Sequence, residues 1–291
     1  MTAVDLLGRP LADKLKAKAA EDVRTMASRG FVPRMAIINA ASDPACAEYA
    51  AVKVRQAAKL GIDTEIYDSG NARLASADDF LHLLDTLSAR RDIQGIFIER
   101  PLPAPLDGPE WIAHLPAVKD VEGIHPQNLG RLFMGSGYEG NFCVPATAMA
   151  CIKILEYYGI DIAGKRAAVV GRSLTVGRPL GSLLLNGDAT ITVCHSRTEN
   201  LADITSQADI LISAVGHPGL ITADMVAEGA VVIDVGTNYT ADGKVVGDTD
   251  YENVRLKASA ITPPRGGVGP VTTALLLGNM VQAALADSSE L

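Results

Sequence analysis

The chain lacks several features that would place it in a specialised class of protein. Its 291 residues carry a formal net charge of −8, which argues against nucleic acid as the main partner because phosphate binding needs a basic surface. Its four cysteines are widely spaced and include no CxxC pair, so neither a zinc site nor a disulfide framework is indicated. We therefore expect no metal and no nucleic-acid partner.

Long apolar runs and targeting signals are also missing from the pattern. No run reaches the roughly 18 apolar residues that a membrane helix needs. No N-terminal stretch combines a charged start, an apolar core and a small-residue cleavage site, and we find no internal repeat or low-complexity tract. We expect a cytoplasmic protein without a membrane partner.

The chain does have a globular composition and the length of two domains. Hydrophobic residues make up 48% and charged residues 21%, as in soluble globular proteins, and 291 residues exceed the usual size of one domain. Apolar runs alternate with helical patterns, which predicts an α/β protein with parallel sheets.

Two series of predicted elements define the domains. The first has helices at 10–29, 44–60 and 76–89 and strands at 35–38, 64–67 and 95–98. After a loop-rich passage, the second has strands at 167–170, 190–194, 210–215, 231–235 and 260–261, with helices at about 177–186, 199–207 and 222–227, which is typical of a Rossmann-like unit. The predicted domains are 1–141, completed by a last helix within 269–291, and 142–268.

A glycine-containing turn follows the predicted strand 167–170. Gly171-Arg-Ser-Leu-Thr-Val-Gly177 stands between this strand and a predicted helix, where a nucleotide phosphate would bind the helix N-terminus. The spacing departs from GxGxxG, so by itself the turn is equally compatible with tight packing. A second glycine-rich loop, 261–272, would permit close backbone approach to a flat ligand.

The end of the next predicted strand bears on the choice of cofactor. An acidic residue usually holds the ribose hydroxyls of NAD at this place, but none occurs after strand 190–194 until Glu199. Ser196 and Arg197, helped by Arg172, suit the 2′-phosphate of NADP. The alternative is that Arg197 is a solvated loop residue.

Three groups of polar residues are candidates for chemistry. Tyr49 and Lys53 stand four residues apart on a predicted helix and share a face; spacing alone favours a surface pair, although a desolvated lysine can act as an acid or base. Glu99 directly follows strand 95–98, and parallel sheets bind ligands at the carboxyl ends of their strands. Asp120, Glu122 and His125 lie on a loop; such clusters are usually solvated, and His125 is expected to be structural.

Taken in order, these motifs resemble the bifunctional methylenetetrahydrofolate dehydrogenase/methenyltetrahydrofolate cyclohydrolase family. The resemblance rests on Asp43-Pro-Ala, Tyr49-x-x-x-Lys53, Pro101-Leu-Pro103, Lys119-Asp-Val, Asn128-x-Gly-Arg131, Gly171-Arg-Ser-x-x-Val-Gly-Arg-Pro179, Gly243-Lys-Val-Val-Gly-Asp248 and Gly266-Gly-Val-Gly-Pro270. It implies a homodimer with a folate cleft between the domains of each protomer. It also implies NADP-dependent oxidation of 5,10-methylenetetrahydrofolate to the 5,10-methenyl form, followed by hydrolysis to 10-formyltetrahydrofolate.

The resemblance also implies roles for individual residues. It assigns catalysis to Lys53, Tyr49 and Glu99, with Tyr49 also stacking in the folate cleft. The other implied folate-binding residues are Asp120, Glu122, Arg265, Gly266, Gly267 and Pro270. The implied NADP-binding residues are Gly171, Arg172, Ser173, Val176, Gly177, Ser196, Arg197 and Thr237.

The folate side departs from the family pattern. Glu99 replaces a glutamine, Arg100 a leucine and Glu122 an aspartate, and Arg265 is a further change. A carboxylate near Lys53 would hold the lysine as an ammonium ion, which is a poor general base. Hydrolysis should then suffer more than hydride transfer, which depends mainly on geometry. Arg100 could instead pair with Glu99 and release Lys53.

Two alternatives follow from the altered folate side. The chain could use methylenetetrahydrofolate as a one-carbon donor to a second substrate, as a transferase or cyclase without net redox. It could also be a non-catalytic relative that binds folate or NADP as a regulator. The retained nucleotide turn argues against the first alternative, and the retained Tyr49 and Lys53 argue against the second.

Overall fold

The computed structural model divides the chain into two compact units. It describes residues 2–41, 44–72, 74, 76–104, 106–107, 109–135, 142–240 and 242–288. Residues 15–131, 138–144 and 276–291 form a unit built on a three-stranded sheet, and residues 1–14, 132–137 and 145–275 form a unit built on a six-stranded sheet. We call them the three-stranded unit and the six-stranded unit.

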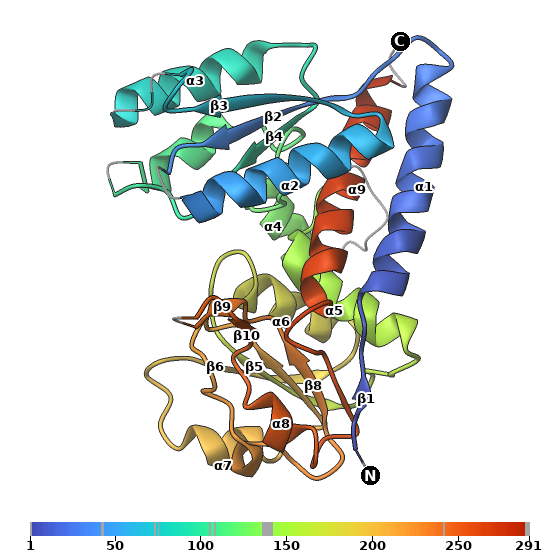
Figure 1. Ribbon diagram of the computed structural model, residues 1–291, viewed down its shortest axis with the longest axis vertical. Helices are drawn as coiled ribbons and strands as arrows, with labels where there is room; N and C mark the ends of the chain where they lie inside the picture. The colour runs from blue at the N-terminus through green and yellow to red at the C-terminus, as the bar shows by residue number, and fades with distance from the viewer. Residues whose placement is uncertain are drawn as a thin grey trace. The chain divides into compact units, whose positions relative to one another are not determined.

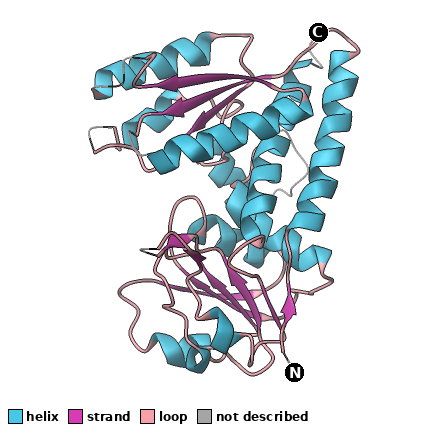
Figure 2. Ribbon diagram, viewed as in Figure 1, coloured by secondary structure: helices cyan, strands magenta, loops and turns pink. Residues whose placement is uncertain are grey.

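The three-stranded unit has a parallel sheet in the order β3–β2–β4. Its strands are β2 (Arg34–Asn39), β3 (Asp63–Asp68) and β4 (Gly95–Ile98). The run of apolar residues in β2 is buried because helices cover both faces of the sheet (Figure 2). The helices of this unit are α1 (Arg9–Ala27) from residue 15 on, α2 (Pro44–Leu60), α3 (Ala77–Ala89), η1 (Pro109–His114), α4 (Pro126–Phe133) up to residue 131 and α9 (Val268–Ser288) from residue 276 on.

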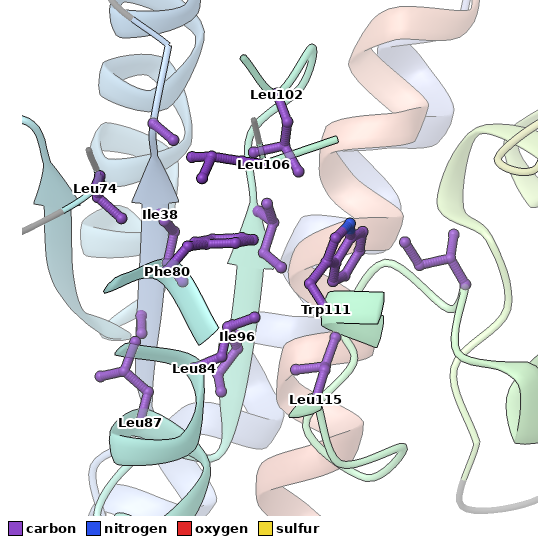
Figure 3. Packing of buried hydrophobic residues seen from close by; sticks show 14 of the residues in the cluster. Ile38, Leu74, Phe80, Leu84, Leu87, Ile96, Leu102, Leu106, Trp111 and Leu115 are labelled. Atoms are coloured by element: carbon purple, nitrogen blue, oxygen red, sulfur yellow. The ribbon is translucent and has the colours of Figure 1, made fainter. Parts of the chain in front are cut away.

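One face of this sheet carries a continuous apolar core. Phe80 and Leu84 of α3 pack against Ile38 and Ile96 of the sheet (Figure 3). Trp111 of η1 meets Phe80 edge to face, with 6.4 Å between ring centroids, a favourable geometry for aromatic pairs. Burying these large side chains holds α3 and η1 on the sheet.

Both ends of α3 are closed by side chains. At the N-terminus, the Ser76 Oγ accepts a hydrogen bond from the Asp79 amide at 3.1 Å. At the other end, the Lys119 Nζ donates to the carbonyl oxygens of Ser88 and Arg90 at 2.8 and 2.6 Å. A cation at a helix C-terminus donates hydrogen bonds to the unpaired carbonyls and interacts favourably with the negative end of the helix dipole. Lys119, part of a motif that suggested a ligand site, therefore has a structural role here.

Helix α9 is long and apolar enough to cross a membrane by length and composition alone. However, 44% of its most apolar window is buried within the protein. Its Asn279 donates to the carbonyl oxygens of Val121 and Val144 at 2.9 and 3.0 Å. A buried core helix passes the same hydropathy test, so the finding is weak evidence for a membrane span.

The six-stranded unit has an all-parallel sheet in the order β1–β11–β8–β7–β5–β6. Its strands are β1 (Val4–Asp5), β5 (Arg166–Val170), β6 (Thr190–Cys194), β7 (Ile210–Ser213), β8 (Val231–Asp234) and β11 (Ala260–Ile261). A separate antiparallel pair joins β9 (Asn238–Tyr239) to β10 (Val245–Val246). The other elements are α5 (Ala146–Tyr157), α6 (Gly177–Asn186), α7 (Leu201–Thr205), η2 (Ala223–Met225) and α8 (Tyr251–Val254).

Helices cover both faces of this sheet, with α6 on one side and α7 and α8 on the other (Figure 1). The α7 side buries Val170, Leu211 and Val232 of the sheet with Val254 of α8. Strand β5 has β6 on one side and β7 on the other, so the strand order reverses at β5. In open α/β sheets, ligands bind at the carboxyl ends of the strands where this reversal occurs.

The predicted strands fall within one or two residues of the observed ones, while several other elements were not predicted. The two-residue strand β1 joins the six-stranded sheet beside β11, whereas the sequence placed all of residues 1–141 in one domain. Residues 1–14 are grouped with the six-stranded unit. Helix α4 lies in the passage expected to be loop, and the helix expected at 222–227 is the single turn η2.

Candidate active site

A buried ion pair lies at the carboxyl edge of the three-stranded sheet. The Lys53 Nζ donates to both carboxylate oxygens of Glu99, at 3.0 and 2.9 Å. The Lys53 side chain is 15% exposed and that of Glu99 is 6% exposed. Their attraction is therefore screened much less by water and salt than that of a surface pair.

The sheet fixes the position of Glu99. Its amide donates to the carbonyl oxygen of Ile38 at 2.8 Å, continuing the β2–β4 ladder beyond Ile98. Because side chains alternate along a strand, Glu99 and Phe97 point to the same face. Lys53 comes from α2 on that face, and its ammonium lies 4.7 Å from the centroid of the Phe97 ring.

A second ion pair joins the neighbouring residues. The Arg100 guanidinium donates to the Glu122 carboxylate at 2.8 Å and lies 6.0 Å from the centre of the Trp111 ring. Burial raises the pKa of Glu122, and the Arg100 charge opposes that rise. The sequence left open whether Glu99 pairs with Lys53 or with Arg100. The structure pairs Glu99 with Lys53 and Arg100 with Glu122.

Asp120 is hydrogen-bonded within its own loop. Its side chain is fully buried, and its two oxygens accept hydrogen bonds from the amides of Gly123 and His125, at 3.0 and 2.7 Å, and from the Asn128 side chain at 2.9 Å. With these donors it organises the loop that leads into α4. Three protein donors therefore engage its two oxygens, and substrate binding by Asp120 stays a prediction.

The remaining predicted residues of this unit are less informative. Tyr49 belongs to α2, but its side chain lies outside the described part of the structure. His125 accepts a hydrogen bond from the Gln127 amide through Nδ1, in keeping with a structural role. Within the described ranges, no group of three His, Cys, Asp or Glu side chains could hold a metal ion.

A cavity of about 840 Å³ opens elsewhere in the three-stranded unit. It is lined by Phe31, Gln94 and Lys119, among others; Phe31 precedes β2 and Gln94 precedes β4. Parallel sheets bind substrates at the opposite, carboxyl edge. We therefore place the chemistry at Lys53 and Glu99 and not in this cavity.

The glycine turn of the six-stranded unit lies where the strand order reverses. Gly171 follows β5 with φ +129°, and a Cβ there would collide with the Ala214 carbonyl oxygen at the end of β7. A Cβ on Gly177 would collide with the Gly171 carbonyl oxygen. Both positions need glycine, and together they leave a backbone cradle of the kind that accepts a dinucleotide.

Some side chains around this turn are bonded within the protein, and others are exposed to solvent. The Ser173 Oγ accepts hydrogen bonds from the amides of Val176 and Gly177, at 3.1 and 3.4 Å, so it caps α6. Arg172 and Thr237 are exposed at the carboxyl edge.

The loop after β6 presents the residues that suggested NADP. The Thr198 amide donates to the His195 carbonyl oxygen at 2.8 Å, and the His195 amide donates to the Thr198 Oγ1 at 2.9 Å. These bonds close a tight turn whose middle residues, Ser196 and Arg197, are exposed. The turn follows β6, next to β5 in the sheet, which is the place expected for contact with the ribose of a dinucleotide.

Arg265, Gly266, Gly267 and Pro270 belong to the six-stranded unit. Gly266 has φ +81°, and its carbonyl oxygen accepts a hydrogen bond from the Gly8 amide at 2.8 Å. Arg265 is exposed. The structure thus groups these predicted folate-binding residues with the nucleotide turn, and not with the unit that carries Lys53 and Glu99.

Sequence reasoning missed the buried Asp248. Its carboxylate accepts hydrogen bonds from the amides of Val215 and His217, at 2.8 and 3.0 Å, and from the Asn238 side chain at 3.0 Å. It therefore fixes the loop after β7, at the same edge as the glycine turn. The Gly243–Asp248 motif was recognised, but no local pattern reveals which distant amides donate hydrogen bonds to Asp248.

An all-parallel sheet with a glycine turn at its reversal point defines a dinucleotide-binding α/β enzyme, and the second unit adds a buried lysine–carboxylate pair. Residues 6–122 match the catalytic-domain model of the tetrahydrofolate dehydrogenase/cyclohydrolase family, and residues 145–288 match its NAD(P)-binding domain model. The chain belongs to this family. The family and fold class expected from the sequence are confirmed.

Individual relatives agree with this placement. The bifunctional protein FolD of Nocardia farcinica is 45% identical over 285 residues, covering 98% of each chain. The crystal structure of the bifunctional dehydrogenase/cyclohydrolase FolD from Campylobacter jejuni is 37% identical, with a TM-score of 0.92 over 98% of this chain and 99% of that one. The Trypanosoma brucei enzyme, solved with NADP and an inhibitor, is 32% identical, with a TM-score of 0.92 and 98% of each chain covered.

Proposed function

We propose that this protein oxidises 5,10-methylenetetrahydrofolate to 5,10-methenyltetrahydrofolate with NADP and hydrolyses that product to 10-formyltetrahydrofolate, with hydrolysis as the slow step. The family models and the bifunctional relatives support both activities, as oxidoreductase and as hydrolase of one-carbon metabolism. The observation that carries the slow hydrolytic step is the contact of 2.9 Å between Lys53 and Glu99.

Oxidation makes modest demands on the ionisable residues. NADP, when bound, supplies the acceptor for a hydride from the methylene carbon. The protein has to bind and align the two partners, and the residues present fit the dinucleotide: Gly171 and Gly177 leave the cradle, and Ser196 and Arg197 are exposed for a 2′-phosphate. The paired state of Lys53 does not hinder this step.

Hydrolysis makes a different demand, because water must lose a proton as it adds to the methenyl carbon. Lys53 is the residue to which the family resemblance assigns this work. Glu99 engages the Lys53 Nζ through both carboxylate oxygens in a setting nearly closed to solvent. Lys53 has to leave this contact before it can act on the attacking water, so hydrolysis is slowed.

The oxidation is tested directly by following NADPH formation from methylenetetrahydrofolate with the purified protein. Sustained NADPH formation that depends on both substrates is the expected result. Absence of NADPH with NADP and of NADH with NAD would refute the proposed oxidation.

Replacing Arg197 with alanine should weaken the use of NADP specifically. A charge-assisted bond to a phosphate contributes about 1.5–3 kcal/mol, so the KM for NADP should rise about 10- to 100-fold, while the KM for NAD should change little. Arg166→Ala is the matched control, because Arg166 stands exposed at the opposite end of the adjacent strand β5. An equal rise in the KM for NADP and the KM for NAD would show that Arg197 does not bind the 2′-phosphate.

The alternatives are less well supported. Neither the family models nor the bifunctional relatives favour a transferase or cyclase acting on a second substrate. A non-catalytic regulator is disfavoured because Lys53 is held in an ordered, buried contact at the edge where parallel sheets bind ligands.

The assembly is a separate proposal: we infer that the protein is a homodimer working in the cytoplasm. Strand β6 is an edge strand of the six-stranded sheet, with Val193 38% exposed and Leu185 of α6 54% exposed. Open strand edges and exposed apolar side chains favour association. Cys143, Cys151 and Cys194 are free thiols, which suits a reducing compartment. Light scattering should give the mass of two chains; a monomer at assay concentrations would contradict the dimer.

A further inference from the structure

Asn39 occupies a position beside the Lys53–Glu99 pair that the proposed chemistry has not used. It is the last residue of β2, at the carboxyl edge of the sheet, and is 6% exposed. Ile38 is in register with Ile98, and the Glu99 amide bonds to the Ile38 carbonyl oxygen. Asn39 and Glu99 are therefore side by side on adjacent strands.

The alternation of side chains places Asn39 on the same face as the ion pair. Ile38 packs into the core under α3 with Ile96 (Figure 3), so Asn39 points to the opposite face. That is the face of Phe97 and Glu99, where Lys53 lies. Side chains in register on adjacent strands stand about 5 Å apart, so the Asn39 side chain lies beside that of Glu99.

The Asn39 side chain has no partner among the residues that the structure describes. Its Oδ1 is fully buried and accepts no hydrogen bond. By contrast, the amide of Asn279, in the same unit, donates to two carbonyl oxygens. A buried polar group without a hydrogen bond destabilises the folded protein, and such groups in native proteins call for an explanation. A donor supplied by a ligand would remove this cost.

The neighbours of Asn39 limit the kind of ligand group that its side chain can bind. Lys53 is engaged with Glu99 through both carboxylate oxygens, which leaves the Asn39 oxygen as an acceptor nearby. We propose that Asn39 is a substrate-binding residue whose Oδ1 accepts a hydrogen bond from an N–H group of the reduced pterin ring of the folate. This assignment rests on the proposed function for the identity of the ligand. It makes Asn39 a binding residue distinct from the catalytic pair.

Replacing Asn39 with leucine separates a binding role from a structural one. Leucine has a similar size and no polar group, so the ligand-free protein should keep its Tm or gain slightly. The Kd for tetrahydrofolate, measured by titration calorimetry, should rise about tenfold or more, as loss of one bond to a buried acceptor implies. Asn39→Ala, which adds no bulk, should give the same two results.

The matched control is Asn279→Leu, which removes an amide that already has protein partners. That variant should lower the Tm of the ligand-free protein. If wild type binds tetrahydrofolate and both Asn39 variants bind it equally well, the inference about Asn39 is wrong while the proposed function stands. The inference also fails if the Asn39 variants lower the Tm of the ligand-free protein as much as Asn279→Leu does. If wild type does not bind tetrahydrofolate, the proposed function fails, and the inference falls with it.

Discussion

Replacing Glu99 with glutamine is expected to raise the rate of methenyltetrahydrofolate hydrolysis by about 100-fold, the lower end of what general acid–base catalysis contributes. Glutamine keeps the size of the side chain but removes the charge that holds the Lys53 Nζ at 2.9 Å. Lys53 can then turn from this contact to the attacking water. NADPH formation should change by no more than about threefold, because hydride transfer depends on alignment and not on this charge.

The measurement is the decay of methenyltetrahydrofolate absorbance with and without each variant. Glu65→Gln is the matched control: Glu65 is a carboxylate of the same sheet that is ion-paired with Arg90, away from Lys53, and its replacement should leave hydrolysis unchanged. An unchanged hydrolysis rate in Glu99→Gln would refute the role assigned to the ion pair.

Replacing Lys53 with methionine should lower the free energy of unfolding by about 3–5 kcal/mol, the usual cost of leaving one member of a buried ion pair without its partner. The Glu99 side chain is only 6% exposed, so water cannot replace the lost ammonium. The double variant Lys53→Met/Glu99→Gln should recover most of this loss, because no charge then remains buried.

Urea denaturation of the wild type, both single variants and the double variant measures this coupling. A double variant as unstable as Lys53→Met alone would show that the loss comes from packing around α2. It would also show that the charge of Glu99 is not effectively buried.

The family and much of the fold follow from local patterns in the sequence. Strands such as Gly95–Ile98 and Thr190–Cys194 are short apolar or β-branched runs bounded by turns, and they are found where the pattern predicts them. The glycine turn after β5 was recognisable because close backbone approach leaves few choices of residue. Strand β1 was missed because two residues carry no periodicity, and its pairing with β11 joins segments about 250 residues apart.

The chemistry of the site depended on contacts that the sequence does not encode locally. Glu99 had two candidate partners, and the choice between Lys53 and Arg100 is made by the sheet, which turns Glu99 toward α2. Arg100, next in sequence, pairs instead with Glu122. Asp120, an acidic residue in a suggestive motif, accepts hydrogen bonds from the amides of its own loop, which the sequence did not reveal. Asn39 gave no signal in the sequence, because the burial of its side-chain oxygen without a partner shows only in the structure.

The central claim is that the oxidation proceeds while the Lys53–Glu99 pair slows the hydrolysis. The most direct test is a timed reaction of the purified protein with methylenetetrahydrofolate and NADP, following NADPH and methenyltetrahydrofolate together. We predict that NADPH forms and that methenyltetrahydrofolate accumulates beyond the level left by its uncatalysed hydrolysis. NADPH formation without such accumulation would mean that hydrolysis keeps pace with oxidation, and would contradict the account of the ion pair.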